Sequence, residues 1–269
     1  MNYSIIIYII GMILKIEAAF MLLPAVTALI YQETCGVAFL ITIVLCLAIG
    51  FPLTRKKPTR KAFYTKEGFV TVALSWIVLS IMGAIPFVIS RSIPNPVDAL
   101  FETVSGFTTT GASILSNVEA LPHCMLMWRS FTHWIGGMGV LVFILSLLPL
   151  TGGYHMNLMK AESPGPSVSK LAPKVQSTAK ILYTIYFVMT VIQIVLLLIG
   201  GMPLFDAICT AFGTAGTGGF GIKNDSMASY STYLQVVITV FMILFGVNFN
   251  AYFFIITKKF AQAFKMEEV

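Results

Sequence analysis

Charged residues are scarce in this sequence of 269 residues. Asp, Glu, Lys and Arg together make up only 10% of it, whereas a typical soluble domain has about 25%. Hydrophobic residues reach 57%, and the mean hydropathy is +0.88. This composition excludes a soluble enzyme, a disordered chain and a nucleic-acid-binding module, so we expect no nucleic acid among the partners.

Motifs for metals and cofactors are also missing. The cysteines show no CxxC and no Cys/His ligand spacing, and we predict that they are small buried hydrophobes. They are Cys35, Cys46, Cys124 and Cys209. The three histidines are too widely spaced for a metal site. GTGGFG at 216–221 matches G-x-G-x-x-G but lacks the strand and helix that dinucleotide binding needs, so no cofactor is expected.

Long apolar runs are abundant instead. A helix of about 20 apolar residues crosses a bilayer core of about 30 Å, and six runs reach that length. They are Ile5–Ile30, Cys35–Leu53, Phe69–Ser90, Met125–Leu150, Ile181–Met202 and Thr232–Thr257. The sequence therefore predicts an all-α integral membrane protein with six transmembrane helices in a lipid bilayer.

The basic residues predict its orientation. Of 17 lysines and arginines, 13 fall between the second and third runs, between the fourth and fifth, or after the sixth. The positive-inside rule makes that side cytoplasmic, so we expect a multi-pass protein of the plasma membrane (cell inner membrane) with both termini inside. Six acidic residues lie on the outer side, where they would attract cations, unless the outer loops merely lack lysine. They are Glu33, Asp98, Glu102, Glu119, Asp206 and Asp225.

Two outer segments repeat each other. Residues 96–115 and 204–223 align without a gap at an offset of 108 positions, which places Asp98 on Asp206, Thr109 on Thr217 and Gly111 on Gly219. An internal repeat of this kind bears on the whole fold. The predicted parts are a transmembrane helix pair (1–54), a basic cytoplasmic loop (55–68), a first helix–pore loop–helix repeat (69–150), a cytoplasmic linker (151–180), a second repeat (181–257) and a cytoplasmic tail (258–269).

In each repeat about ten apolar residues lead into a run of Gly and Thr. The apolar part predicts a short half-helix that re-enters the membrane, and the run after it predicts extended backbone. Such backbone is tolerated at membrane depth only where protein shields it or where it lines a water-filled path. Carbonyl groups pointing into that path can replace the hydration shell of an ion, and the C-terminal end of a half-helix favours cations.

Polar and small residues within the runs have simpler interpretations. Gly136, Gly137 and Gly139 predict close helix packing more than a hinge. His133 beside Trp134 predicts an anchor at the outer interface. Lys15 and Glu17 fall within the first run, where charges suggest function, although Lys15 could extend to the inner surface.

SGFTTTGAS (105–113), WRSFTHWIGGMGVLV (128–142) and AESPGPSVSKLAP (161–173) resemble the Trk/Ktr/HKT superfamily of potassium transporters, TrkH branch. The resemblance implies potassium uptake through a filter of stacked pore loops. It implies filter positions Thr108, Thr109, Thr110, Gly111 and Ala112, and Gly216, Thr217, Gly218, Gly219 and Phe220. Potassium, at these residues, is the only metal expected. In the superfamily, glycine at the filter position accompanies potassium preference and serine accompanies sodium.

The resemblance also implies a homodimer and a cytoplasmic nucleotide-binding regulatory ring, so any nucleotide would belong to the partner. The family has four repeats around one pore, whereas this sequence holds two. Two copies could pair, a second half-chain could supply the rest, or the chain could be a fragment; we favour the last two. A non-conducting, truncated or regulatory fragment that pairs with a complete transporter remains the alternative.

A membrane-embedded enzyme is the third hypothesis. It would need titratable groups that converge at one depth. Only Asp98, Glu102 and Asp206 lie near the re-entrant segments, without His or Lys close in sequence. We therefore predict no enzyme, and we assign these three acids to the pore mouth. Asp98 and Asp206 could instead hold the starts of the half-helices, where an acid suits the dipole.

Overall fold

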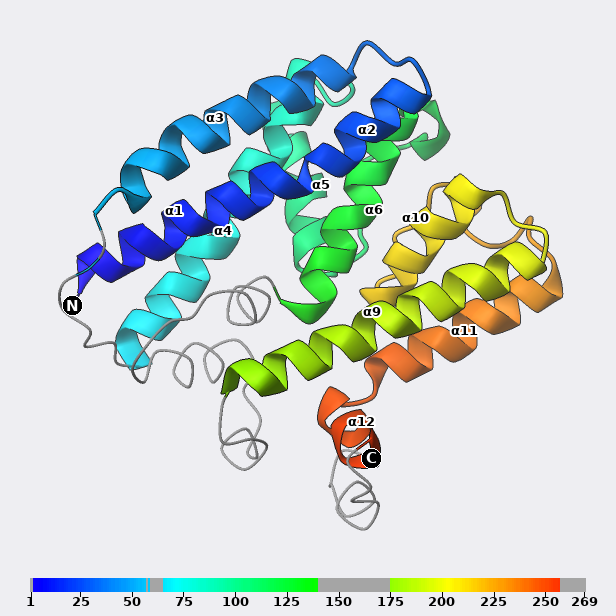
Figure 1. Cartoon of the computed structure of the whole chain (residues 1–269). Coiled ribbons are helices and arrows are strands. Elements are labelled where there is room, and N and C mark those ends of the chain that lie inside the picture. The colour runs from blue at the N-terminus through cyan, green and yellow to red at the C-terminus, as the bar shows by residue number, and fades with distance from the viewer. Residues whose placement is uncertain (1, 57, 59–64, 140–174, 257–269) are drawn as a thin grey trace.

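A computed structural model describes residues 2–56, 58, 65–139 and 175–256, and all of the regular secondary structure within these ranges is helical (Figure 1). The helices are α1 (Tyr3–Phe20), α2 (Leu22–Ile30), α3 (Gly36–Thr54), α4 (Thr65–Ile89), α5 (Pro96–Phe107), the 3-10 turn η1 (Val118–Ala120), α6 (His123–Met138), α9 (Val175–Ile199), α10 (Leu204–Ala215), α11 (Thr232–Gly246) and α12 (Phe249–Ile256). Outside the described residues lie the whole predicted tail (258–269), most of the predicted linker (151–180) and half of the predicted basic loop (55–68).

The N-terminal part of the fold consists of α1, α2 and α3. α1 and α2 follow one line with a break at Met21, because Pro24 has no N–H to donate to the turn before it. α3 returns alongside them (Figure 1). α1 and α3 approach closely at Gly11 and Gly50, where a Cβ on Gly50 would lie 2.9 Å from the Gly11 carbonyl oxygen.

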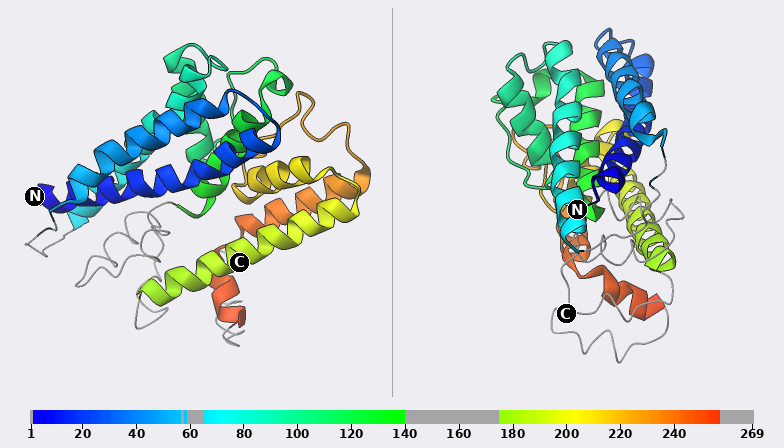
Figure 2. Two further views of the ribbon diagram at one scale, coloured as in Figure 1. Left: turned by 45° about the horizontal axis from the view of Figure 1, so that its top comes forward. Right: turned by 90° about the vertical axis from the view of Figure 1, so that its left-hand side faces the viewer.

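Among the described residues, four segments are long and apolar enough to cross a membrane: Tyr3–Ile30, Gly36–Thr54, Lys66–Ile89 and Lys180–Ile199. They match the first, second, third and fifth predicted runs. In the fourth predicted run, α6 ends at Met138. The rest of that run, beyond Gly139, lies outside the described residues. The sixth run is not one helix, because Val247 is extended and separates α11 from α12; α12 turns away from α11 (Figure 2).

The sequence repeat has a counterpart in the helix lengths. α5 and α10 have 12 residues each, and their ends correspond at the offset of 108 positions seen in the sequence. α6 and α11 end at Met138 and Gly246, again 108 positions apart. A helix of 12 residues is about 18 Å long, which is too short to cross a bilayer core.

α6 lies at the centre of the molecule and contacts α2, α5 and α10. Its aromatic residues join the two repeats, since Phe131 and Trp134 both pack against Phe212 of α10 and Trp134 also packs against Tyr186 of α9. Large apolar side chains cover the outward faces of α3, α4, α9 and α11, and contiguous exposed apolar surface of this kind suits a lipid environment.

The two charges of the first run have different surroundings. The Lys15 ammonium lies 4.5 Å from the ring centroid of Phe51, near the end of α3 that carries Arg55. This position fits a lysine that extends toward the surface. Glu17 is 0% exposed, and neither of its carboxylate oxygens has a hydrogen-bond partner among the described residues.

Candidate functional site

Two loops with the same backbone follow α5 and α10. The first turns through left-handed φ values of 55° at Thr109 and 74° at Gly111, and the second through 59° at Thr217 and 67° at Gly219. Their hydrogen bonds also correspond: the Thr109 amide donates to Gly106 O at 3.0 Å, and the Thr217 amide to Thr214 O at 2.8 Å. Left-handed φ is unusual for threonine, so its recurrence at the same place in both loops marks a shared, specified conformation.

The two loops touch each other. A Cβ on Gly111 would collide with the Gly218 carbonyl oxygen, and a Cβ on Gly218 would lie 2.6 Å from the Thr109 carbonyl oxygen. Segments 108 positions apart in sequence therefore share one site, in which the absence of side chains at Gly111 and Gly218 allows backbone to pack on backbone.

The glycines of α6 lie directly behind this site. A Cβ on Gly136 would collide with the Phe107 carbonyl at the end of α5, and one on Gly137 would lie 3.0 Å from the Ala215 carbonyl at the end of α10. The prediction of close packing at these glycines is thus confirmed. Gly139, with φ of 73°, ends α6.

The predicted filter residues differ in exposure. In the first loop Thr108, Thr110 and Ala112 are exposed, while Thr109 and Gly111 are half-buried. The second loop has a different pattern. Thr217 and Gly219 are exposed, Gly218 is half-buried, and Gly216 and Phe220 are buried.

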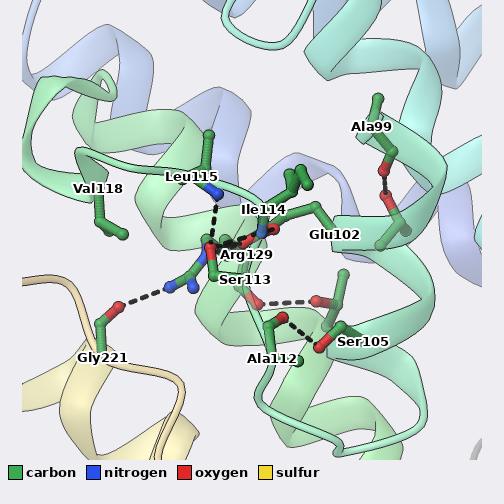
Figure 3. A network of polar contacts seen from close by, with 12 residues as sticks. Ala99, Glu102, Ser105, Ala112, Ser113, Ile114, Leu115, Val118, Arg129 and Gly221 are labelled. Carbon is green, nitrogen blue, oxygen red and sulfur yellow. Dashed lines mark hydrogen bonds and ion pairs between the residues drawn. The ribbon is translucent and has the colours of Figure 1, made fainter. Parts of the chain in front are cut away.

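One carbonyl of the first loop is already bound, because the Ser105 hydroxyl donates to Ala112 O at 2.5 Å (Figure 3). The Phe220 ring serves as an anchor, stacked on His133 at a centroid distance of 5.2 Å.

A buried ion pair connects the two loops. Arg129 of α6 donates through Nε to Glu102 Oε1 at 2.5 Å and through Nη1 to the Gly221 carbonyl at 2.5 Å (Figure 3). The side chains of Arg129 and Glu102 are 3% and 0% exposed. Glu102 in turn accepts from the Ser113 hydroxyl at 2.9 Å and from the Ile114 amide at 3.0 Å. One carboxylate and one guanidinium thus fix the segments that follow both left-handed turns.

The predicted mouth acids have different locations. Asp206 is half-buried in the first turn of α10 and accepts a hydrogen bond from the Tyr230 hydroxyl at 2.8 Å. Asp98 lies half-buried in the first turn of α5, which Asn95 caps. Both therefore lie at the starts of the two 12-residue helices. The placement of Glu102 at an open mouth is wrong: its carboxylate is buried, because Arg129 and the segment around Ser113 cover it.

His133 also departs from its predicted place. It is 0% exposed and fills the space behind Gly216 and Gly218, so it does not anchor α6 at an interface. Arg129 and His133 stand four residues apart in an apolar helix, which places them on one face. That spacing could have predicted a polar face of this helix directed into the protein. This signal was missed, because Arg129 was counted only as a charge on the outer side.

Glu33 fixes the start of α6 from a distant segment. Its carboxylate accepts from the His123 amide at 2.7 Å and from the Cys124 amide at 2.9 Å, and Oε1 lies 3.0 Å from His123 Nδ1. Partial burial alone would raise the pKa of Glu33, but the hydrogen bonds from Cys124 and His123 outweigh it and lower the pKa. A carboxylate at a helix N-terminus also suits the helix dipole.

We expect Glu33 to make stability depend on pH. A lowered folded-state pKa contributes stability that is complete above the unfolded value of about 4.3 and is lost as the pH falls through the lower folded value. Glu33→Ala should lower the free energy of unfolding at neutral pH by about 0.5–2 kcal/mol, as for other lost caps. It should also flatten the acid limb, which is the fall in the free energy of unfolding as the pH drops below about 4.3. Thermal unfolding in detergent between pH 3 and 7 measures both; an unchanged acid limb would contradict the assignment.

Comparisons with known proteins agree with this architecture. The family model described as TrkH, cation transport protein, matches residues 36–267. A Trk system potassium uptake protein TrkH of Salmonella typhimurium is 39% identical over 261 residues, which cover 94% of this chain and 53% of that protein. An uncharacterized cation transporter of Methanocaldococcus jannaschii is 33% identical over 258 residues, covering 95% and 53%.

A solved structure shows the same fold. The crystal structure of the potassium transporter TrkH from Vibrio parahaemolyticus matches with a TM-score of 0.80 and 32% identity, covering 94% of this chain and 52% of that one. The chain spans about half the length of the curated relatives it matches.

Proposed function

The chain belongs to the TrkH family of cation transport proteins, and we propose that it forms half of a potassium-conducting pore in the plasma membrane. The relatives carry the names of transport and uptake proteins, which sets aside the membrane-embedded enzyme. Family membership and the apolar helices place the chain in a membrane. We propose six crossings with both termini cytoplasmic, in keeping with the basic segments on one side.

The observation that carries the proposal is the pair of matched loops in contact at Gly111 and Gly218. In the proposed pore, α5 and α10 are re-entrant half-helices, and residues 108–112 and 216–220 are two walls of the filter. Left-handed residues stand at corresponding positions of both loops, and we propose that the carbonyls of these loops face a common path. Backbone carbonyls in such an array can replace the hydration shell of an ion. Potassium is the transported ion, and the chain itself needs no cofactor.

The remaining walls come from outside the described residues. Because the chain spans about half the length of its relatives, we propose that a second half-chain or a second copy completes the filter. A cytoplasmic nucleotide-binding ring would then act on the inner face. The alternative is a non-conducting fragment that pairs with a complete transporter. The same observation, that the chain spans about half the length of its relatives, supports it.

Potassium uptake in a potassium-auxotrophic host tests the proposal. The chain is expressed alone, with a candidate second half, and with a complete transporter. Uptake at low potassium in either of the first two cases supports the half-pore, and Gly219→Ser should alter it. A chain that reaches the membrane, supports no uptake in those two cases and changes only the activity of the complete transporter would favour the alternative.

A further inference from the structure

Two cysteines from distant parts of the sequence meet at one end of the helix bundle. Cys35 immediately precedes α3, and Cys124 lies in the first turn of α6. Their Sγ atoms are 3.1 Å apart. Cys35 is half-buried and Cys124 is buried, so an oxidant can reach the pair through Cys35. The sequence spacing of 89 positions gave no sign of this encounter.

We propose that Cys35 and Cys124 close into a disulfide that joins the N-terminal helix pair to the first pore repeat. A disulfide has an S–S bond of about 2.05 Å, so the sulfur atoms need to move by only about 1 Å. The inference rests on the proposed orientation in one respect: that orientation places this end of the bundle outside the cell, where disulfides form and persist.

A metal ion is the competing explanation of the same cluster. Ligand atoms of Glu33, Cys35 and Cys124 all lie within 4.8 Å of one another. Two thiolates on one tetrahedral zinc, each at about 2.3 Å, lie about 3.8 Å apart, and the observed separation is well below that. The Glu33 oxygens already accept hydrogen bonds from His123 and Cys124 at the start of α6. Both observations favour the disulfide.

The oxidation balances with an ordinary disulfide oxidant, either oxidised glutathione or a dithiol oxidase in its disulfide form. The Cys35 thiolate attacks one sulfur of the oxidant, which forms a mixed disulfide and releases one thiolate. The Cys124 thiolate then attacks Cys35 Sγ, which forms the Cys35–Cys124 bond and releases the second thiolate. The chain loses two protons and two electrons, and the oxidant gains them as two thiols.

The bond would act on the element that holds the site. α6 carries Arg129 five residues after Cys124 and His133 nine residues after it. α1 already packs on α6 through Phe20 and Phe131, whose ring centroids are 5.5 Å apart. A covalent link at the start of α6 would hold this helix against the N-terminal pair when the membrane or a partner strains it.

Thiol counting on the full chain tests the proposal without any need for transport. Cells that express it are quenched with acid, the membranes are dissolved in denaturant with a chelator, and the free thiols react with a maleimide-polyethylene glycol that retards the protein on a gel. We expect two of the four cysteines to react before reduction and all four after it. Cys124→Ser should show three in both conditions, whereas the matched control Cys209→Ser should show one before and three after.

Two results would overturn the disulfide. The first is four reactive thiols before reduction even after the membranes have been incubated with oxidised glutathione. The second is four reactive thiols together with about one zinc ion per purified chain, which would assign the cluster to a metal. Because the readout is a thiol count, a chain that fails to conduct potassium still gives a clear answer here.

Discussion

Gly219→Ser should reduce the preference for potassium over sodium, while Gly111→Ser should disrupt the site itself. Both glycines have left-handed φ, and a side chain there costs about 1–2 kcal/mol. They differ in surroundings. Within the part of the chain that the structure describes, a Cβ on Gly219 would have only Met242 nearby, at 4.0 Å, whereas one on Gly111 would collide with the Gly218 carbonyl. Serine at 219 thus fits and adds a hydroxyl beside the filter, whereas serine at 111 must push the two loops apart.

Gly201→Ser is the matched control. Gly201 has a φ of 83°, and no atom of the described residues would lie within 4 Å of a Cβ placed there. It precedes α10 and lies outside the filter. It should therefore show the backbone strain alone, with selectivity unchanged. Ion competition in uptake by the conducting assembly measures selectivity, and thermal unfolding in detergent measures the fold. If neither filter variant changes the potassium-to-sodium ratio or the stability relative to Gly201→Ser, the filter assignment fails.

Much of this architecture could be predicted from sequence because it depends on local composition. Apolar run length predicted the first three spans and the fifth, and a direct alignment of 96–115 with 204–223 predicted that α5 and α10 would match. The break at Val247 was missed because α11 and α12 are both apolar. Hydropathy reports the environment of a segment and carries no signal for where its hydrogen-bond ladder stops.

The site was harder to predict because its polar contacts join distant segments. Glu102 looked like a mouth residue as long as its partner was unknown, and only the fold brings Arg129 to it from the next helix. The pairing of Cys35 with Cys124 has the same origin, since α2, α3 and α6 must pack before those thiols meet. Residue type indicated which groups matter, whereas their partners depended on tertiary packing.

Arg129→Met should be the most destabilising single change in this site. It would leave the Glu102 carboxylate buried without its counter-ion, and breaking a buried pair from one side costs about 3–5 kcal/mol. It would also free the Gly221 carbonyl and remove the guanidinium that lies 3.4 Å from the Phe220 ring centroid. The second loop should therefore loosen along with the first. Thermal unfolding in detergent reports the stability, and ion flux reports the loop.

Glu102→Gln and the double variant separate charge from packing. Glutamine keeps an oxygen that can accept from Ser113 and Ile114, so the first loop should retain part of its anchor. In Arg129→Met with Glu102→Gln no unpaired charge remains, and the double variant should be more stable than Arg129→Met alone. The resulting double-mutant cycle should give a coupling energy in the range of about 0.5–3 kcal/mol seen for residues in contact. Additive effects would mean that the two side chains do not form the ion pair.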